Sequence, residues 1–293
     1  MDVFRTPDER FDELPDFAFE PRYLDVDGLR LARVDDGEGP PVVFVHGEPT
    51  WSFLWRHVIP PVRDAGFRCI APDHAGFGRS DKPTDVAWYT YDRHVELLSA
   101  LVEELDLRDA TIVVHDWGGP IGLRLAAEQP KRIARMALMD TGLFTGHQRM
   151  SDNWLRFRDF VARTEDVPIS LLVRRACKTD PGDEIAAAYD APFPTAESKA
   201  GAKAFPALIP LTPDAPGAAA GQRALDTLRG DTRPKLVLWA DSDPVLPVET
   251  GRALARALGT ELHHVVPDAG HFLQEDQGPR VGALLADWLR STA

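Results

Sequence analysis

One short stretch of the chain combines a carboxylate with the turn residues that would expose it. Asp116 follows the β-branched run at residues 111–114, which is typical of a buried strand. Gly118 and Gly119 come next and permit a tight turn into an apolar, helix-like segment. A strand, a sharp turn and a helix in this order can project a nucleophile above a sheet. The spacing therefore predicts that Asp116 is an exposed nucleophile.

A carboxylate at this position determines the expected chemistry. An unperturbed Asp, with a pKa of about 3.9, is ionised at neutral pH and needs no base to act as a nucleophile. Its attack on an sp3 carbon gives an ester between enzyme and substrate, which water must then cleave with the help of a base. The alternative interpretation is that Asp116 only caps the helix that starts at Gly118.

His271 is the candidate base for that second step. It follows the last expected strand and a glycine, at the edge where open α/β sheets place their sites. A neutral imidazole there can take a proton from water. Two acids could orient the ring. Asp243 follows the strand that ends at Trp239 and Asp140 follows the strand that ends at Met139, and the residues alone leave both open.

Ester cleavage passes through an oxyanion, which needs N–H donors. The backbone N–H of Trp117, directly after the nucleophile, is one candidate. Glu48 follows the buried run at residues 41–45 and is the expected second backbone donor, because Pro49 has no N–H. The Glu48 side chain could also position the hydrolytic water. His46 is interpreted as a buried structural histidine.

The elements that must position these residues alternate between strands and helices. Strands are expected at residues 22–26, 29–34, 41–45, 68–71, 111–114, 133–139, 235–239 and 261–266. Helices are expected before Gly66, from residue 92, after residue 118, at 249–258 and from about residue 280. This alternation predicts an α/β fold with a mostly parallel sheet covered on both faces.

The strand pattern stops in the middle of the chain. Between residues 145 and 229 no buried strand is expected, and helical stretches at 153–162 and 169–177 give way to six prolines within residues 192–216. The sheet pattern resumes at residue 235. We therefore expect a helical cap at residues 145–229, inserted into a core made of residues 1–144 and 230–293.

Composition limits the classes of partner. The chain has 293 residues, of which 44% are apolar and 27% charged, as in ordinary globular proteins. Its net charge of -13 argues against nucleic acid or an anionic membrane surface as a partner. Cys69 and Cys177 give neither a disulfide framework nor a metal-type spacing. No hydrophobic signal core is present in residues 1–15, so a cytoplasmic protein is expected. The expected chemistry needs neither a metal nor an organic cofactor.

Along nearly its whole length the chain resembles haloalkane dehalogenases of the α/β-hydrolase superfamily. The matching stretches are residues 46–52 (HGEPTWS), 76–83 (GFGRSDKP), 116–119 (DWGG), 189–194 (YDAPFP) and 269–275 (AGHFLQE). The first and fourth look like the subgroup that carries its acid after the later strand, which favours Asp243 over Asp140. Asp116, Asp243 and His271 also follow the nucleophile, acid and histidine order of α/β hydrolases.

The resemblance implies that Asp116 displaces a halide from carbon and that Trp117 donates its indole N–H to the leaving anion. In the subgroup with Glu at position 48, a cap tryptophan is expected as the second donor, a dozen or so residues before Tyr189. Residues 174–178 read RRACK there, with no tryptophan.

Other donors must then complete the halide site. Trp154 is the sole tryptophan of the expected cap and is one candidate. Arg174 or Arg175 could compensate if either turned inward, because charged donors form stronger hydrogen bonds. Without a full second donor we expect a slow enzyme that binds halide weakly and favours bromide and iodide leaving groups over chloride.

The expected reaction converts a small apolar haloalkane and water into an alcohol, a halide and a proton. An epoxide hydrolase is the alternative, since that family shares the Asp nucleophile and often the DWGG turn. It polarises the epoxide oxygen with two cap tyrosines, whereas the expected cap contains only Tyr189. A non-catalytic ligand receptor on a hydrolase scaffold is a further alternative, although such proteins often lose a member of the triad.

Overall fold

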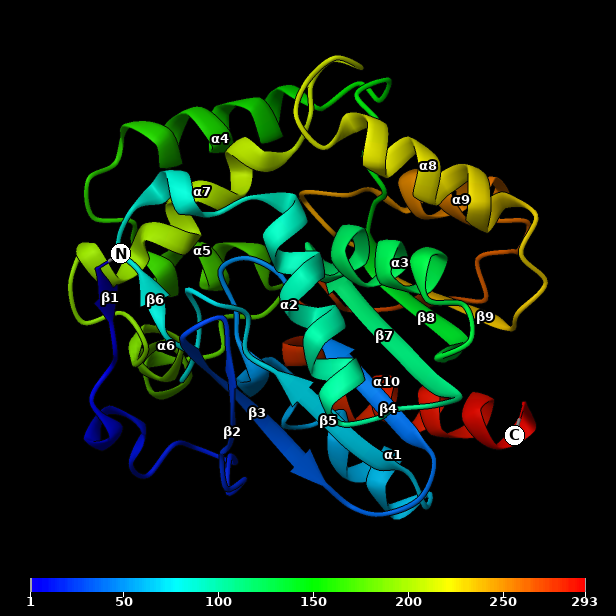
Figure 1. The fold of residues 1–293 in the computed structure, drawn as a ribbon, viewed down its shortest axis with the longest axis horizontal. Coiled ribbons are helices and arrows are strands. Elements are labelled where there is room, and N and C mark those ends of the chain that lie inside the picture. The colour runs from blue at the N-terminus through cyan, green and yellow to red at the C-terminus, as the bar shows by residue number, and fades with distance from the viewer. Residues whose placement is uncertain (1, 293) are drawn as a thin grey trace.

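Residues 2–292 of the chain, described by a computed structural model, contain an eight-stranded sheet with helices on both faces (Figure 1). The strand order is β10–β9–β8–β7–β4–β5–β3–β2. Only β3 runs antiparallel to its neighbours, and every other pair is parallel. The strands are β2 (Arg22–Val26), β3 (Leu29–Asp36), β4 (Pro41–Val45), β5 (Arg68–Pro72), β7 (Ala110–Asp116), β8 (Ile133–Thr141), β9 (Lys235–Ala240) and β10 (His264–Val266). The predicted α/β fold with a mostly parallel sheet is confirmed.

The two central strands bring the expected site loops together. β4 and β7 are apolar runs that are buried almost throughout, as parallel strands covered on both faces must be. Their register pairs Val45 with Val114, so both strands end at the same edge of the sheet. The loop that contains Glu48 and the turn that contains Asp116 therefore begin side by side.

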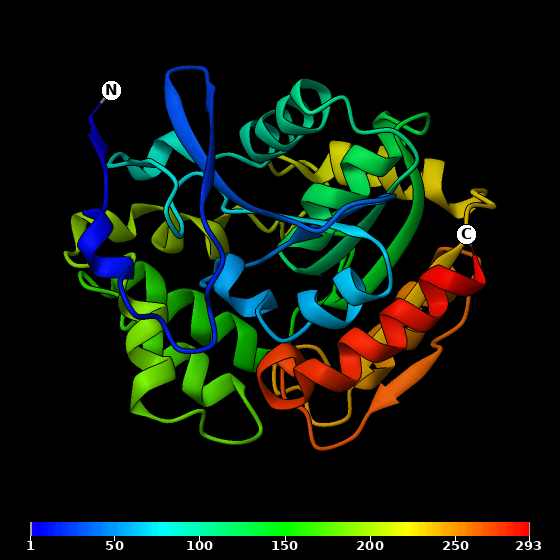
Figure 2. The same ribbon diagram turned by 90° about the horizontal axis from the view of Figure 1, so that it is seen from below.

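Helices cover the two faces of the sheet. On one face α2 (Tyr91–Glu104), α3 (Gly118–Glu128) and α8 (Ala218–Arg229) pack next to one another. On the other face α1 (Ile59–Asp64) packs against α10 (Leu273–Ser291). Figure 2 shows α10 and α2 on opposite sides of the sheet. The remaining core helix, α9 (Val248–Ala257), packs against β9.

Five helices lie between β8 and β9 in the chain. They are α4 (Asp152–Arg163), α5 (Ile169–Ala176), α6 (Asp183–Asp190), α7 (Ala200–Leu208) and α8. α4 packs against α7, and α5 packs against α6, at one end of the sheet (Figure 1). A buried polar cluster ties α6 to the core, because the Tyr189 hydroxyl donates to Glu275, whose oxygens also accept from Arg56 at 2.5 and 2.7 Å.

The structure departs from the predicted elements in a few places. The last helix begins at Leu273 instead of near residue 280, with a kink at Gln277 just before Pro279. The strand expected at 261–266 is shortened to His264–Val266. Short elements that the pattern does not indicate are β1 (Val3–Phe4), β6 (Lys82–Pro83), and the 3-10 helices η1 (Asp8–Phe11), η2 (Ser52–Trp55), η3 (Val86–Trp88) and η4 (Glu197–Lys199). None of the helices in residues 2–292 is both long and apolar enough to span a bilayer.

Candidate active site

Asp116 occupies the turn between β7 and α3 in a strained backbone conformation. Its φ is +48°, in the left-handed region that residues other than glycine rarely adopt. The turn passes so close to β4 that a Cβ on Gly118 would lie 2.0 Å from the carbonyl oxygen of Val45. The hydroxyl of Thr141 donates to the Asp116 carbonyl oxygen at 2.5 Å. These contacts hold the carboxylate at the carboxyl edge of the sheet, facing a cavity.

The Asp116 carboxylate is held by backbone donors and by a histidine. The N–H of Glu48 donates to Oδ1 at 2.8 Å, and Oδ2 lies 3.5 Å from Nε2 of His271. Gly47 leaves room for this carboxylate, since a Cβ there would lie 2.2 Å from Oδ1. Burial raises the pKa of Asp116, but the hydrogen bond and charge of His271 and the backbone N–H of Trp117 outweigh it and hold the pKa below its ordinary value. The nucleophile is therefore ionised.

His271 is fixed by a carboxylate on its other side. Its Nδ1 lies 2.8 Å from Oδ2 of Asp243, whose Oδ1 accepts from the N–H groups of Val245 and Leu246 at 2.6 and 3.0 Å. Burial lowers the pKa of His271, but the negative charges of Asp243 and Asp116 raise it well above its ordinary value. The two carboxylates thus favour the protonated form of the ring in the resting site.

Asp140, the alternative acid, lies beside Asp243 and not against His271. Both of its oxygens accept from the N–H of Ala240, at 3.1 and 3.2 Å, and the side chain is fully buried. Burial and the charge of Asp243 raise the pKa of Asp140 well above its ordinary value. Burial and Asp243 therefore favour the neutral form of Asp140, which lies beside the pair that Asp243 forms with His271.

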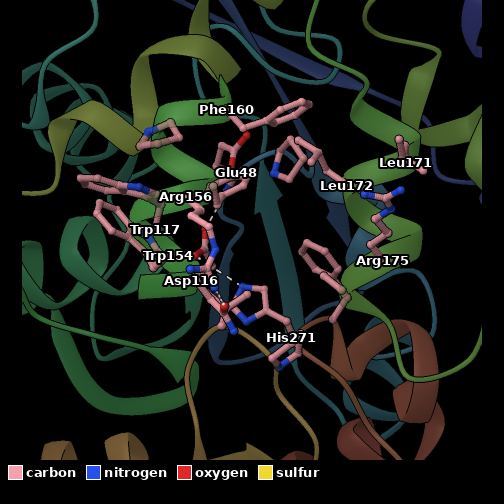
Figure 3. A pocket seen from close by; sticks show the side chains of 18 of the residues that line it. Glu48, Asp116, Trp117, Trp154, Arg156, Phe160, Leu171, Leu172, Arg175 and His271 are labelled. Atoms are coloured by element: carbon pink, nitrogen blue, oxygen red, sulfur yellow. Dashed lines mark hydrogen bonds and ion pairs between the residues drawn. The ribbon is translucent and has the colours of Figure 1, made fainter. Parts of the chain in front are cut away.

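A cavity of about 380 Å³ lies above Asp116 and His271 (Figure 3). This volume is within the range of small-molecule sites. Helices α4 and α5 contribute most of its apolar wall, which includes Phe157, Phe160, Leu171, Leu172, Ile209 and Phe272. The cavity therefore offers an apolar space directly over the carboxylate.

Two tryptophans line this cavity with free indole N–H groups. Trp117 and Trp154 are both almost fully buried, and neither indole N–H has an acceptor within residues 2–292. Figure 3 shows both on the same side of Asp116. Trp154 reaches the site from α4, far earlier in the chain than the segment before Tyr189 where the resemblance located a second donor.

The two arginines considered as halide donors differ in their surroundings. Arg174 forms ion pairs with Asp180 at 2.7 Å and with Asp183 at 2.6 Å, and it does not line the cavity. Arg175 does line the cavity, but Figure 3 shows it on the opposite side of Asp116 from the tryptophans. Of the three candidate donors, only Trp154 therefore lies on the same side of Asp116 as Trp117.

The Glu48 side chain is an unusual group on the cavity floor. It is 7% exposed, and Oε1 has no hydrogen-bond partner among the residues that the structure describes. Burial raises the pKa of Glu48 well above its ordinary value, the charge of Asp116 adds to this, and His271 opposes it. Burial and the charge of Asp116 thus favour the protonated form of this carboxyl group, which faces the Asp116 carboxylate and the imidazole.

Two supporting residues were missed by the reasoning from sequence. Nε2 of His115 donates to the carbonyl oxygen of His271 at 2.8 Å, and burial lowers the pKa of His115 to about 4, so this ring stays neutral. Asp276 accepts from the N–H of Gly270 at 2.9 Å and from those of residues 178 and 179 at 2.8 and 2.9 Å. The position of His115 next to the nucleophile was a usable signal, whereas nothing in the sequence pattern marks Asp276.

Two other site types have no counterpart here. Across residues 2–292, no group of three or more His, Cys, Asp or Glu side chains could hold a metal ion. The two tyrosines of an epoxide-polarising site are also missing, since none of the tyrosines in the described part of the chain lines the cavity. Tyr189 is fully buried and donates its hydroxyl to Glu275 instead.

Known proteins with similar sequences and structures point to one family. Residues 40–277 match the family described as alpha/beta hydrolase fold. The chain is 42% identical to a haloalkane dehalogenase of Mycobacterium marinum over 98% of this chain and 100% of the relative. It is 40% identical to a haloalkane dehalogenase of Psychrobacter cryohalolentis over 99% and 98% of the two chains. Haloalkane dehalogenase DpaA from Paraglaciecola agarilytica NO2 superposes with a TM-score of 0.89, 33% identity and 97% coverage of both chains.

Proposed function

The chain belongs to the haloalkane dehalogenases of the α/β-hydrolase fold and is an enzyme that acts on carbon–halogen bonds, and we propose that Asp116, His271 and Asp243 carry its reaction. One observation supports this assignment above all. A continuous series of contacts joins Asp116 to His271 at 3.5 Å and His271 to Asp243 at 2.8 Å, under an apolar cavity. The relatives do not favour an epoxide hydrolase.

In the first step the Asp116 carboxylate attacks the carbon that bears the halogen. A carbon–oxygen bond forms, the carbon–halogen bond breaks, and its electron pair leaves with the halide. Since Oδ1 accepts from the Glu48 N–H, Oδ2 is the oxygen we assign to the new ester. The indole N–H groups of Trp117 and Trp154 are the proposed donors to the departing anion. An indole N–H can only donate a hydrogen bond, which suits a negatively charged partner.

Alkylation itself prepares the base for the second step. It removes the negative charge of Asp116, one of the causes that raise the pKa of His271. The ring then releases its proton to solvent more readily, and its Nε2 can accept a proton from water while Asp243 stabilises the imidazolium. The hydroxide attacks Cγ of Asp116, and Oδ1 becomes an oxyanion held by the backbone N–H groups of Glu48 and Trp117. Collapse expels the alkoxide, which takes the proton of the new carboxyl group and leaves as the alcohol, while the ring keeps the proton that it took from water. Haloalkane and water thus give alcohol, halide and the proton that the ring first released.

The wider assignments are part of the same proposal. Residues 145–229 would form the cap and residues 1–144 and 230–293 the core, with α8 packed against α3 of the core. The cavity fits a small apolar halogenated substrate, water and a halide product. A cytoplasmic location, without a membrane or nucleic-acid partner, also remains a proposal, and fractionation of cells that express the chain tests it.

Trapping the ester intermediate tests the mechanism. We expect His271→Ala to release one bromide per chain from 1-bromohexane and then stop, because no base remains for ester hydrolysis. Its intact mass should rise by one hexyl group, and peptide mapping should locate this group on Asp116. The matched control is the double variant Asp116→Asn, His271→Ala, which should gain no mass. A hexyl group on any other residue contradicts the assignment of the nucleophile.

A further inference from the structure

Two arginines line the active-site cavity without an acidic partner. Arg156 on α4 and Arg175 on α5 both line it and are both exposed, so they lie where it meets solvent. Neither forms a salt bridge with an Asp or Glu in the part of the chain that the structure describes, and Arg156 donates only to the side-chain oxygen of Asn153. Their positive charges are therefore available to a ligand.

Two other cations of the same helical region form ion pairs, whereas Arg158, on the same helix as Arg156, forms none with the residues that the structure describes but does not line the cavity. Arg174, next to Arg175 in the chain, pairs with Asp180 and Asp183, and Lys199 pairs with Asp166. Within residues 2–292, the carboxyl groups that line the cavity are those of Glu48 and Asp116, both on its floor. In a chain with a net charge of -13, the cavity thus has acidic groups at its floor and unpaired cations at its opening.

The same opening carries exposed apolar side chains. Phe160 and Leu171 are 46% and 41% exposed, and both line the cavity. Figure 3 shows Phe160, Leu171 and Arg175 on the side of the cavity away from His271. Exposed apolar surface beside a pocket marks a ligand-binding area, and guanidinium groups beside it suit a carboxylate, which they can bind in a bidentate manner.

We propose that the preferred substrates are haloalkanes with an anionic group at the end opposite the halogen, such as ω-haloalkanoates. The halogen would lie at Trp117, the alkyl chain along the apolar wall, and the carboxylate at Arg156 and Arg175. This inference rests on the proposed function of the site and adds the substrate class. The chemical steps are unchanged, because the carboxylate of the substrate takes no part in them.

A series of paired substrates tests the inference. We would measure kcat and KM for bromide release from ω-bromoalkanoates of increasing length and from their methyl esters, at low ionic strength. At the length that spans the cavity, the acid should exceed its ester about 10-fold in kcat/KM, mainly through KM, as expected for two partly exposed ion pairs. Added sodium sulfate should reduce this ratio by screening.

Matched variants assign the effect to the two arginines. The double variant Arg156→Gln, Arg175→Gln should bring the ratio of kcat/KM for the acid to kcat/KM for the ester close to one. Each single variant should give an intermediate ratio. Arg158→Gln removes a charge from the same helix, but Arg158 does not line the cavity, so the ratio should stay at the wild-type value.

The outcomes separate the inference from the proposed function. Acids that react no faster than their esters, or a preference that survives the double variant, would overturn the inference. A double variant that slows acid and ester equally would assign the arginines to bromide release and also overturn it. Absence of bromide release from every compound, including 1-bromohexane, would instead contradict the proposed function.

Discussion

The floor and the roof of the cavity are built in different ways. We call the lining residues Glu48, Asp116, Trp117 and His271, together with Asp243 behind His271, the floor, and the lining side chains of α4, α5 and α7 the roof. On the floor, Asp116, Asp243 and His271 form a hydrogen-bonded and ion-paired series, anchored by backbone N–H groups at the ends of strands.

The roof is less constrained. Its lining side chains are mostly apolar, some are more than a third exposed, and its two arginines have no carboxylate partner in residues 2–292. The contrast follows from what each part must do. Charge that develops in a reaction is stabilised best by groups already held in place, whereas selection of a substrate needs shape and complementary charge. We therefore propose that the floor determines the reaction and that the roof selects the substrate.

The largest expected effect comes from breaking the acid on the floor. Asp243→Asn should slow hydrolysis of the ester by about 10⁴-fold, because the wrong tautomer of His271 is then favoured. Asp140→Asn should cost about 10-fold or less, since burial and Asp243 favour the neutral form of Asp140, which an amide resembles. Single-turnover measurements of the decay of the alkyl-enzyme, followed by intact mass, compare the two. The reverse ranking would transfer the role to Asp140.

Most of the floor residues could be predicted from the sequence, because their positions depend on the order of strands and turns along the chain. Each floor residue follows a strand, and the carboxyl ends of parallel strands meet at one edge. The order of elements along the chain could not decide whether Asp243 or Asp140 is the acid that orients His271. Both follow strands to the same edge, and Asp140 is turned away from His271 by its bonds to the N–H of Ala240, a contact between β8 and β9.

The residues of the roof could be predicted less well, because tertiary packing decides which side chains of these helices reach the cavity. Trp154 reaches the cavity only because α4 packs across α7, and the helical spacing of α4 does not specify that neighbour. α7 forms although Pro206 lies inside it. Similarly, a helix was expected only from about residue 280, whereas α10 begins at Leu273 and continues past the kink at Gln277.

An intermediate effect should come from the two indoles, one on the floor and one on the roof. If both donate to the halide, Trp117→Phe and Trp154→Phe should each weaken bromide binding about 10-fold, in keeping with a hydrogen bond to a charged group. Bromide titration monitored by tryptophan fluorescence measures this, and Trp288→Phe, which lies outside the cavity, is the control. Unchanged bromide binding in Trp154→Phe would show that the roof takes no part in the halide site.

The smallest expected effect concerns the buried carboxyl group of Glu48. Its pKa is raised in the folded protein, first by burial and then by the charge of Asp116, while in the unfolded chain it loses its proton near pH 4.3 or so. The folded state therefore binds more protons above that pH, and the free energy of unfolding falls as pH rises toward the raised pKa.

Glu48→Gln removes this titration but keeps the backbone N–H that holds Asp116. The variant should gain little stability near pH 4 and progressively more as the pH rises toward 7 and above. Thermal unfolding across this pH range measures the gain. Glu165→Gln, an exposed carboxyl group between α4 and α5, is the matched control and should change stability by less than about 0.5 kcal/mol at every pH. A gain in stability of Glu48→Gln that does not grow with pH would contradict the raised pKa and would mean that the folded protein holds Glu48 as a carboxylate.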